Sequence, residues 1–215
     1  MSKPTVPLPM TGKGWESCFG ADSKVHRGYL PTLALLTRGR LHWWQNVVTV
    51  NKYGGKSETG MPDFGIVLGG GLHFVECKHE SGAGMTLGRL TATKDAAGDD
   101  LWTGTGVKPL QATWMDLATD AGATCWIAAR LEVGATARAK SAQVRLGGPS
   151  DPLPPVITRL IPWAAWRSPM AAAEDARRRE ETPDASIPAA TLATMGYPLN
   201  SAADLLAALR HNPAA

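Results

Sequence analysis

Apolar positions in the first half of the chain either form short continuous runs, as in buried strands, or recur at mixed helical spacing. Residues 63–68 and 72–78 are apolar runs joined by three consecutive glycines, and this pattern predicts a β-hairpin. Upstream, residues 42–50 are rich in aromatic and β-branched side chains and predict a strand. Residues 12–36 have mixed helical spacing and predict one long or broken helix. The hairpin is the clearest element in the sequence.

A helix is predicted downstream of the hairpin. Residues 81–107 are rich in glycine and have no sustained period, so we expect a long functional loop there. Residues 108–121 predict a helix, because Pro109 lies in the first turn and Gly122 follows the last. The apolar face expected for this helix consists of Leu110, Trp114, Leu117 and Ala121.

Further apolar runs predict a buried strand at residues 124–131 and weaker strands at residues 142–146 and 158–162. Helix, strands, helix and strand in this order predict a mixed α/β domain over residues 12–168. From Pro169 onward the composition shifts to alanine and charge, so residues 169–215 are predicted to be an appended, partly helical tail. Within the tail, residues 177–179 are expected on a solvated helix face and residues 202–210 in a short helix.

Composition narrows the class of protein only slightly. The chain has 215 residues, 44% of them hydrophobic and 19% charged, which is enough for a packed core. The net charge of +3 permits nucleic-acid binding without arguing for it. Cys18, Cys77 and Cys125 are widely spaced and predict neither a disulfide framework nor a zinc site. The sequence contains no run long enough to cross a bilayer and no signal-peptide pattern, so we expect a cytoplasmic protein without a membrane partner.

The candidate chemistry lies on the predicted hairpin. Residues two apart in a strand point to the same face, so Glu76 and Lys78 project together while Cys77 turns away. The hairpin returns the chain so that Asp63, at the start of the partner strand, can approach Glu76. Paired carboxylates with room for water suit Mg²⁺, with Mn²⁺ as a substitute, and the backbone carbonyl of Cys77 could add a ligand. This set predicts metal-dependent phosphodiester hydrolysis, with Lys78 orienting water or stabilising the phosphorane.

An acid and a lysine two apart on a strand are, as an isolated pattern, a solvated face in ~9 of 10 cases. In this sequence the surroundings are apolar. Val75 and Cys77 occupy one face, and Leu72 and Phe74 the other. The charged pair is therefore expected to end a buried strand, where charges need a partner.

Pro62-Asp63 followed by Glu76-Cys77-Lys78 after an apolar hairpin resembles the PD-(D/E)XK nuclease superfamily. Residues 12–19 (GKGWESCF) and 107–111 (VKPLQ) extend this likeness to Holliday junction resolvases of the RecU and Hjc type. The resemblance implies a restriction-endonuclease-like mixed β-sheet flanked by helices. It also implies that Glu16 reaches the metal site from a helix, that Gln111 is a polar neighbour, and that the protein is a homodimer. From its position in a first helical turn alone, Gln111 could equally be a local cap.

The function implied by this resemblance is magnesium-dependent resolution of four-way DNA junctions. One alternative is another nuclease of the same fold, of restriction or repair type, acting on duplex or single-stranded DNA. A second alternative is a non-catalytic DNA-binding module. The family often has a histidine where this chain has Leu110, and this departure leaves the substrate open.

Basic side chains near the proposed site could neutralise DNA phosphates, or could be scattered solubilising charge at about even odds. They are Lys13, Lys24, Arg27, Lys52, Lys56 and Lys94, and the loop of residues 51–61 is the best candidate among these segments. Four tryptophans are expected in the core rather than stacked on bases, namely Trp43, Trp44, Trp114 and Trp126. His73 is expected to be a hydrogen-bonded core histidine.

Overall fold

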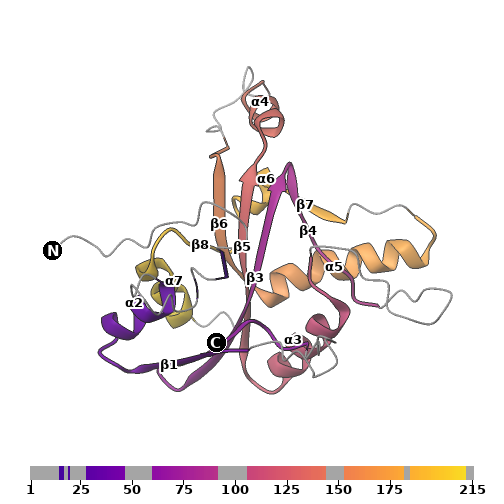
Figure 1. Ribbon diagram of the computed structural model, residues 1–215. Coiled ribbons are helices and arrows are strands. Elements are labelled where there is room, and N and C mark those ends of the chain that lie inside the picture. Colours follow the sequence, from indigo (N-terminus) through magenta and orange to yellow (C-terminus); the bar gives the residue numbers. More distant parts are fainter. Residues whose placement is uncertain are drawn as a thin grey trace, which may run out of the picture.

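A mixed six-stranded β-sheet forms the centre of the computed structural model (Figure 1). The structure describes residues 15, 16, 19, 28–46, 60–91, 106–143, 153–181 and 185–211, and for residues 140–143 the backbone only. The strand order is β1-β2-β3-β5-β6-β8, with β3 and β5 parallel and all other neighbours antiparallel. The strands are β1 (Leu41–Gln45), β2 (Phe64–Leu68), β3 (Gly71–Gly82), β5 (Thr124–Val133), β6 (Val156–Pro162) and β8 (Tyr197–Pro198).

Helices cover both faces of this sheet. One face packs against α2 (Tyr29–Leu36) and α7 (Ala202–Arg210), together with Trp15 and Phe19. The other packs against α3 (Pro109–Asp120), α5 (Trp163–Arg178) and α6 (Ala189–Leu192), and against a two-stranded sheet of β4 (Gly84–Thr86) and β7 (Ser186–Pro188). Helix α4 (Ala135–Gln143) follows β5. The expected mixed α/β architecture is confirmed.

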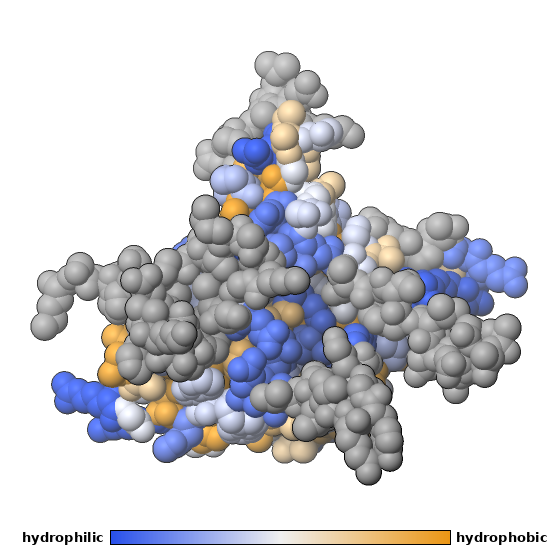
Figure 2. Space-filling view, in the orientation of Figure 1, coloured by the Kyte–Doolittle hydropathy of each residue, from blue (hydrophilic) through white to orange (hydrophobic). Residues whose placement is uncertain are grey.

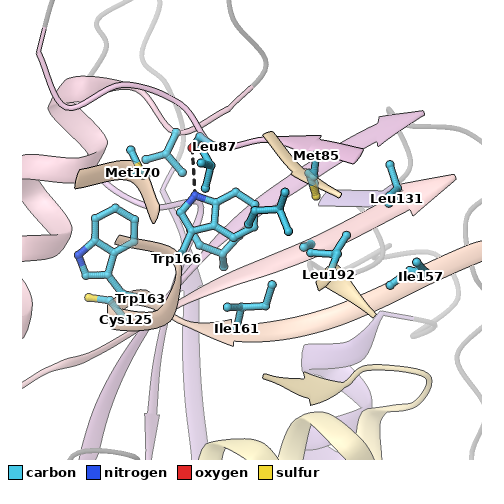
Figure 3. Close-up of a cluster of buried hydrophobic side chains, with 14 of the residues drawn as sticks. Met85, Leu87, Cys125, Leu131, Ile157, Ile161, Trp163, Trp166, Met170 and Leu192 are labelled. Carbon is cyan, nitrogen blue, oxygen red and sulfur yellow. Dashed lines mark hydrogen bonds between the residues drawn. The ribbon is translucent and has the colours of Figure 1, made fainter. Parts of the chain in front are cut away.

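The second face has a densely packed aliphatic and aromatic core (Figure 3). Trp166 is fully buried there, and its indole N–H donates to the carbonyl oxygen of Leu87 at 3.0 Å. This bond satisfies the polar atom that a buried tryptophan carries into an apolar interior. It also ties α5 to the segment that follows β4.

The predicted β-hairpin is present. Strands β2 and β3 pair antiparallel from Phe64 opposite Val75 to Leu68 opposite Gly71. Gly69 and Gly70 form the two-residue turn with φ angles of 60° and 86°, a left-handed conformation that glycine adopts at low cost. The glycine turn therefore sets the register of the hairpin between two continuous apolar runs.

The helix expected at residues 108–121 is present as α3, but its buried face differs from the expected one. Leu110 and Leu117 are 51% and 64% exposed, whereas Ala112 and Met115 are buried. The prediction was wrong for Leu110 and Leu117, because the helix instead turns Ala112 and Met115 toward the sheet and packs Trp114 against Phe74. The leucines are left on the outer side.

Other elements agree with the sequence in part. Strand β5 extends the expected residues 124–131 by two, to Val133, and β6 contains the expected residues 158–162. The expected strand at 142–146 was wrong at residues 142 and 143, which end helix α4. The expected loop at 81–107 contains the end of β3, the strand β4 and a bridge between Gly88 and Val107. Residues 47–50, 92–105 and 144–146 lie outside the described part of the chain.

The segment after Pro169 is built into the domain. Helix α5 begins at Trp163 and so runs across the expected boundary at residue 168, because its buried apolar series starts with Trp163 and Trp166. Strand β8 pairs with β6 at the edge of the main sheet. Leu205 of α7 is fully buried in the core that α7 shares with α2. The helices expected in this segment are present, and the strands β7 and β8 are additional.

The arginines of α5 fit the expected solvated face in part. Arg178 pairs with Asp175, and both side chains are more than half exposed. Arg177 instead bonds Glu174, which is buried and accepts the backbone N–H of Leu90. Within the described residues, no helix is long and apolar enough to span a membrane.

A close backbone contact between Gly88 and Val107 positions the start of α3, and it can be tested by substitution. A Cβ atom at Gly88 would lie 2.1 Å from the Val107 carbonyl oxygen, whereas one at Gly70 would meet nothing within 4 Å. Both glycines have positive φ, so alanine is strained at either position. We expect Gly88→Ala to lower the free energy of unfolding by roughly 1 to 3 kcal/mol more than the control Gly70→Ala, measured by urea denaturation. Equal losses in the two variants would contradict the contact.

Candidate functional site

Asp63 and Glu76 are brought together by the start of β2 and the middle of β3. Phe64 pairs with Val75 across the two antiparallel strands. Asp63, the residue before Phe64, therefore lies beside Glu76 and Cys77. The Asp63 carboxylate oxygen Oδ2 accepts the backbone N–H of Cys77 at 2.7 Å. Asn46 holds the same segment from β1, since its amide donates to the Pro62 carbonyl at 2.6 Å. The site therefore depends on three adjacent strands, β1, β2 and β3.

Glu76 is nearly inaccessible, with 2% of its side chain exposed. Its Oε1 atom lies 2.8 Å from Lys78 Nζ and accepts the Gln111 side-chain N–H at 2.6 Å. Among the described residues, its Oε2 atom is buried without a hydrogen-bond partner. A buried carboxylate oxygen without a partner costs free energy unless a ligand satisfies it. This atom is the strongest indication that the site receives a cation or a donor from outside.

Gln111 links helix α3 to this strand. Its Oε1 atom accepts both the Lys78 ammonium at 3.3 Å and the Lys108 backbone N–H at 3.1 Å, while its Nε2 donates to Glu76. The bond to Lys108 belongs to the capping box that begins α3. The two interpretations of Gln111, as a local cap and as a neighbour of the acids, therefore both describe its geometry.

The electrostatics of the pair favour a proton on Asp63 in the absence of a cation. Burial and the nearby Glu76 carboxylate raise the pKa of Asp63 to about 8, Glu16 adds to the rise, and the Cys77 N–H and Lys78 oppose it. Burial, followed by the charges of Asp63 and Glu76, also raises the pKa of the Cys77 thiol well above its ordinary value. The thiol is therefore protonated at neutral pH.

Glu16 stands near the pair on the side of β1. It is exposed, and its Oε1 atom accepts the Gln45 side-chain N–H at 2.8 Å. Gln45 and Asn46 were not recognised from the sequence as part of the site. The available signal was that two amides, Gln45 and Asn46, interrupt the aromatic and β-branched run of residues 42–50. Polar residues at a strand end next to a predicted acid can position that acid.

The donor set fits a hard divalent cation held by few protein ligands. Within the described part of the chain, no three His, Cys, Asp or Glu side chains form a group that could enclose a metal ion. Mg²⁺ commonly uses one or two carboxylates and retains several waters, which Asp63 and the free oxygen of Glu76 could satisfy. Glu16 and the Cys77 carbonyl remain predicted additional ligands. Figure 2 shows hydrophilic residues over the middle of the sheet, where β3 lies in Figure 1.

The remaining expectations have mixed outcomes. His73 is 4% exposed and accepts the Trp126 indole N–H, as expected of a core histidine. Trp126 is fully buried, whereas Trp44 is 39% exposed and lies over Gly65, so the core prediction was wrong for Trp44. Trp43 and Trp114 are half-buried. The proposed DNA contacts Lys13, Lys24, Arg27, Lys52, Lys56 and Lys94 all lie outside the described residues.

No protein-family model and no curated protein matches this sequence. The functional argument therefore depends on the side chains of the site itself.

The raised pKa of Asp63 predicts how the stability of the metal-free protein depends on pH. The unfolded carboxyl titrates near its ordinary value of 3.8, whereas the folded one holds its proton until about pH 8. The folded state binds more protons between these values, so stability falls as pH rises from about 4 to about 8. We expect Asp63→Asn to flatten this slope and to gain a few kcal/mol over the wild type near pH 8, because one pKa unit corresponds to about 1.4 kcal/mol.

Urea denaturation in chelator at several pH values measures this slope. Asp175→Asn, which neutralises an exposed carboxylate on α5, is the control and should keep the wild-type slope. A wild-type slope in Asp63→Asn would show that Asp63 is already ionised in the folded protein.

Proposed function

We propose that this chain is a magnesium-dependent DNA endonuclease of the PD-(D/E)XK type that resolves four-way junctions. The observation that carries the proposal is the asymmetric environment of Glu76. One carboxylate oxygen is held by Lys78 and Gln111, while the other is buried without a partner beside the protonated Asp63. Such an arrangement is suited to holding a divalent cation.

The arrangement of the elements supports the same proposal. The acids lie on an antiparallel hairpin whose second strand, β3, pairs in parallel with β5, and α3 precedes β5 and supplies Gln111. A restriction-endonuclease-like core, which the resemblance implies, is likewise a mixed sheet flanked by helices. The Asp, Glu and Lys of the motif share one site, with Lys78 in contact with Glu76.

The roles of the residues follow from their contacts. When bound, Mg²⁺ would act as a Lewis acid on the phosphodiester and lower the pKa of a bound water. Asp63 and Glu76 would hold it, and Asp63 would give up its proton as the cation binds. The Lys78 ammonium is fixed by Glu76 and Gln111, so its charge can stabilise the negative charge that develops on the phosphoryl oxygens. Gln111 keeps both groups in position from α3.

The junction as substrate rests on the resemblance of residues 12–19 and 107–111, and the homodimer rests on it too. Paired cuts across a four-way junction need two active sites related by a two-fold axis. A duplex-cutting or single-strand-cutting nuclease with the same site is the alternative. Substrate choice separates these two proposals.

Substitution of Glu76 tests the metal site. We expect Glu76→Gln to lower cleavage in Mg²⁺ or Mn²⁺ by at least about a thousandfold, because the site loses a charged ligand, while DNA binding persists. The wild type should cleave in neither chelator nor Ca²⁺, since the looser Ca²⁺ geometry positions water poorly. Gel assays of cleavage and binding measure both effects, and Glu181→Gln, an exposed acid, is the control. Cleavage by Glu76→Gln within tenfold of the wild type would exclude this site as the catalytic one.

Comparison of substrates tests the junction. We expect the purified full chain to cleave a four-way junction at least tenfold faster than a linear duplex with the same arms, in paired nicks of opposite strands. Denaturing gels with each strand labelled in turn measure the rates. Equal rates on junction and duplex would favour a nuclease that cuts duplex DNA. Cleavage of single strands alone would favour a nuclease that cuts single-stranded DNA.

A further inference from the structure

A second polar cavity lies at the opposite end of the β2–β3 hairpin from Asp63. It has a volume of about 630 Å³ and lies beside the glycine turn and the C-terminal ends of α2 and α7. Gly71, at its wall, is five residues from Glu76 along β3, which corresponds to roughly 17 Å at the usual rise of a strand. The cavity is therefore separate from the carboxylate site.

The charge on the wall of this cavity is positive. Arg38, Arg40 and Arg210 contribute to its lining, and no aspartate or glutamate is among the described residues that line it. Within the described part of the chain, none of these three arginines forms an ion pair with a carboxylate. Three cations that share one cavity without a counter-ion repel each other unless an anion joins them.

Helix dipoles offer a structural explanation for these arginines, but it covers only part of the charge. Helices α2 and α7 end at the cavity, and Gly122, just beyond α3, lines it too. Each helix C-terminus carries about half a negative charge, so three of them offset roughly 1.5 charges. The three arginines together carry three positive charges. A net positive potential remains after the helix ends have been counted.

The cavity also offers neutral donors and room for an anion to approach the backbone. Gly69 and Gly122 have positive φ, and a Cβ atom there would meet nothing, so the backbone is accessible at both. The Trp126 N–H donates to Nδ1 of His73 at 3.4 Å, which places the proton of the neutral ring on Nε2. That Nε2 atom lies 3.1 Å from the position that a Cβ atom would take at Gly71, a residue that lines the cavity.

We propose that this cavity binds a phosphate group, held by the guanidinium groups of Arg38, Arg40 and Arg210. Guanidinium forks match the oxygens of a phosphate and bind them in pairs. The phosphate can belong to a DNA backbone or to a small phosphorylated compound, and both share this chemistry.

Binding of inorganic phosphate to the metal-free full chain tests the site directly. We expect the double variant Arg38→Gln with Arg40→Gln, and separately Arg210→Gln, to weaken phosphate binding at least tenfold in isothermal titration calorimetry. Arg178→Gln, on α5, is the matched control and should bind as the wild type does, as should Glu76→Gln. All the substituted arginines are exposed, and unchanged thermal unfolding verifies that each variant is folded.

Binding of a linear duplex at several salt concentrations identifies the source of the phosphate. If it is DNA, the double variant lowers the slope of log affinity against log salt by about 2, since each lost phosphate contact removes roughly 0.9. If the slope stays unchanged while phosphate binding is lost, the ligand is a small phosphorylated compound. Absence of phosphate binding by the wild type, or wild-type binding by the arginine variants, would overturn the site.

Discussion

Repulsion between the buried Glu76 carboxylate and the half-buried Asp63 carboxylate is the constraint on which the rest of the site depends. Two like charges about 5 Å apart cost roughly 3 kcal/mol at an effective dielectric constant near 20. Asp63 and Glu76 are held close despite this, and the chain offsets the repulsion with the Lys78 ammonium, the Gln111 amide and the Cys77 N–H. A proton on Asp63 removes the remainder. The side chains of the site are therefore already in position. The negative charge that protonation removes from Asp63 would return if a cation displaced the proton.

The groups that offset this repulsion come from distant parts of the sequence, so tertiary packing sets the geometry. Gln111 reaches Glu76 from α3, which is separated from β3 by a long segment. The start of α3 is fixed in turn by the bridge between Gly88 and Val107, and the segment at Leu90 is held by Glu174 of α5. A helix from the C-terminal third thus supports the wall of a site built on the first hairpin.

Local signals allowed part of this to be predicted from the sequence. The glycine turn between two apolar runs set the register of the hairpin, and hence the approach of Asp63 to Glu76. Contacts between residues far apart in the sequence could not be predicted in this way. The exposure of Leu117 depends on which side of α3 faces the sheet, and the pairing of β8 with β6 has no local pattern. Likewise, the bond of Gln45 to Glu16 joins residues whose separate surroundings give no sign of a partner.

Cys77, between Glu76 and Lys78 in the motif, affects which ions and reagents the site can tolerate. Its thiol stays protonated because burial and two neighbouring acids disfavour the thiolate. Thiophilic ions such as cadmium and mercury bind the thiolate form, and alkylating agents react with the same form. Burial first, and the neighbouring acids second, therefore keep the sulfur beside the acids in its protonated form, which reacts slowly with soft metals and alkylating agents.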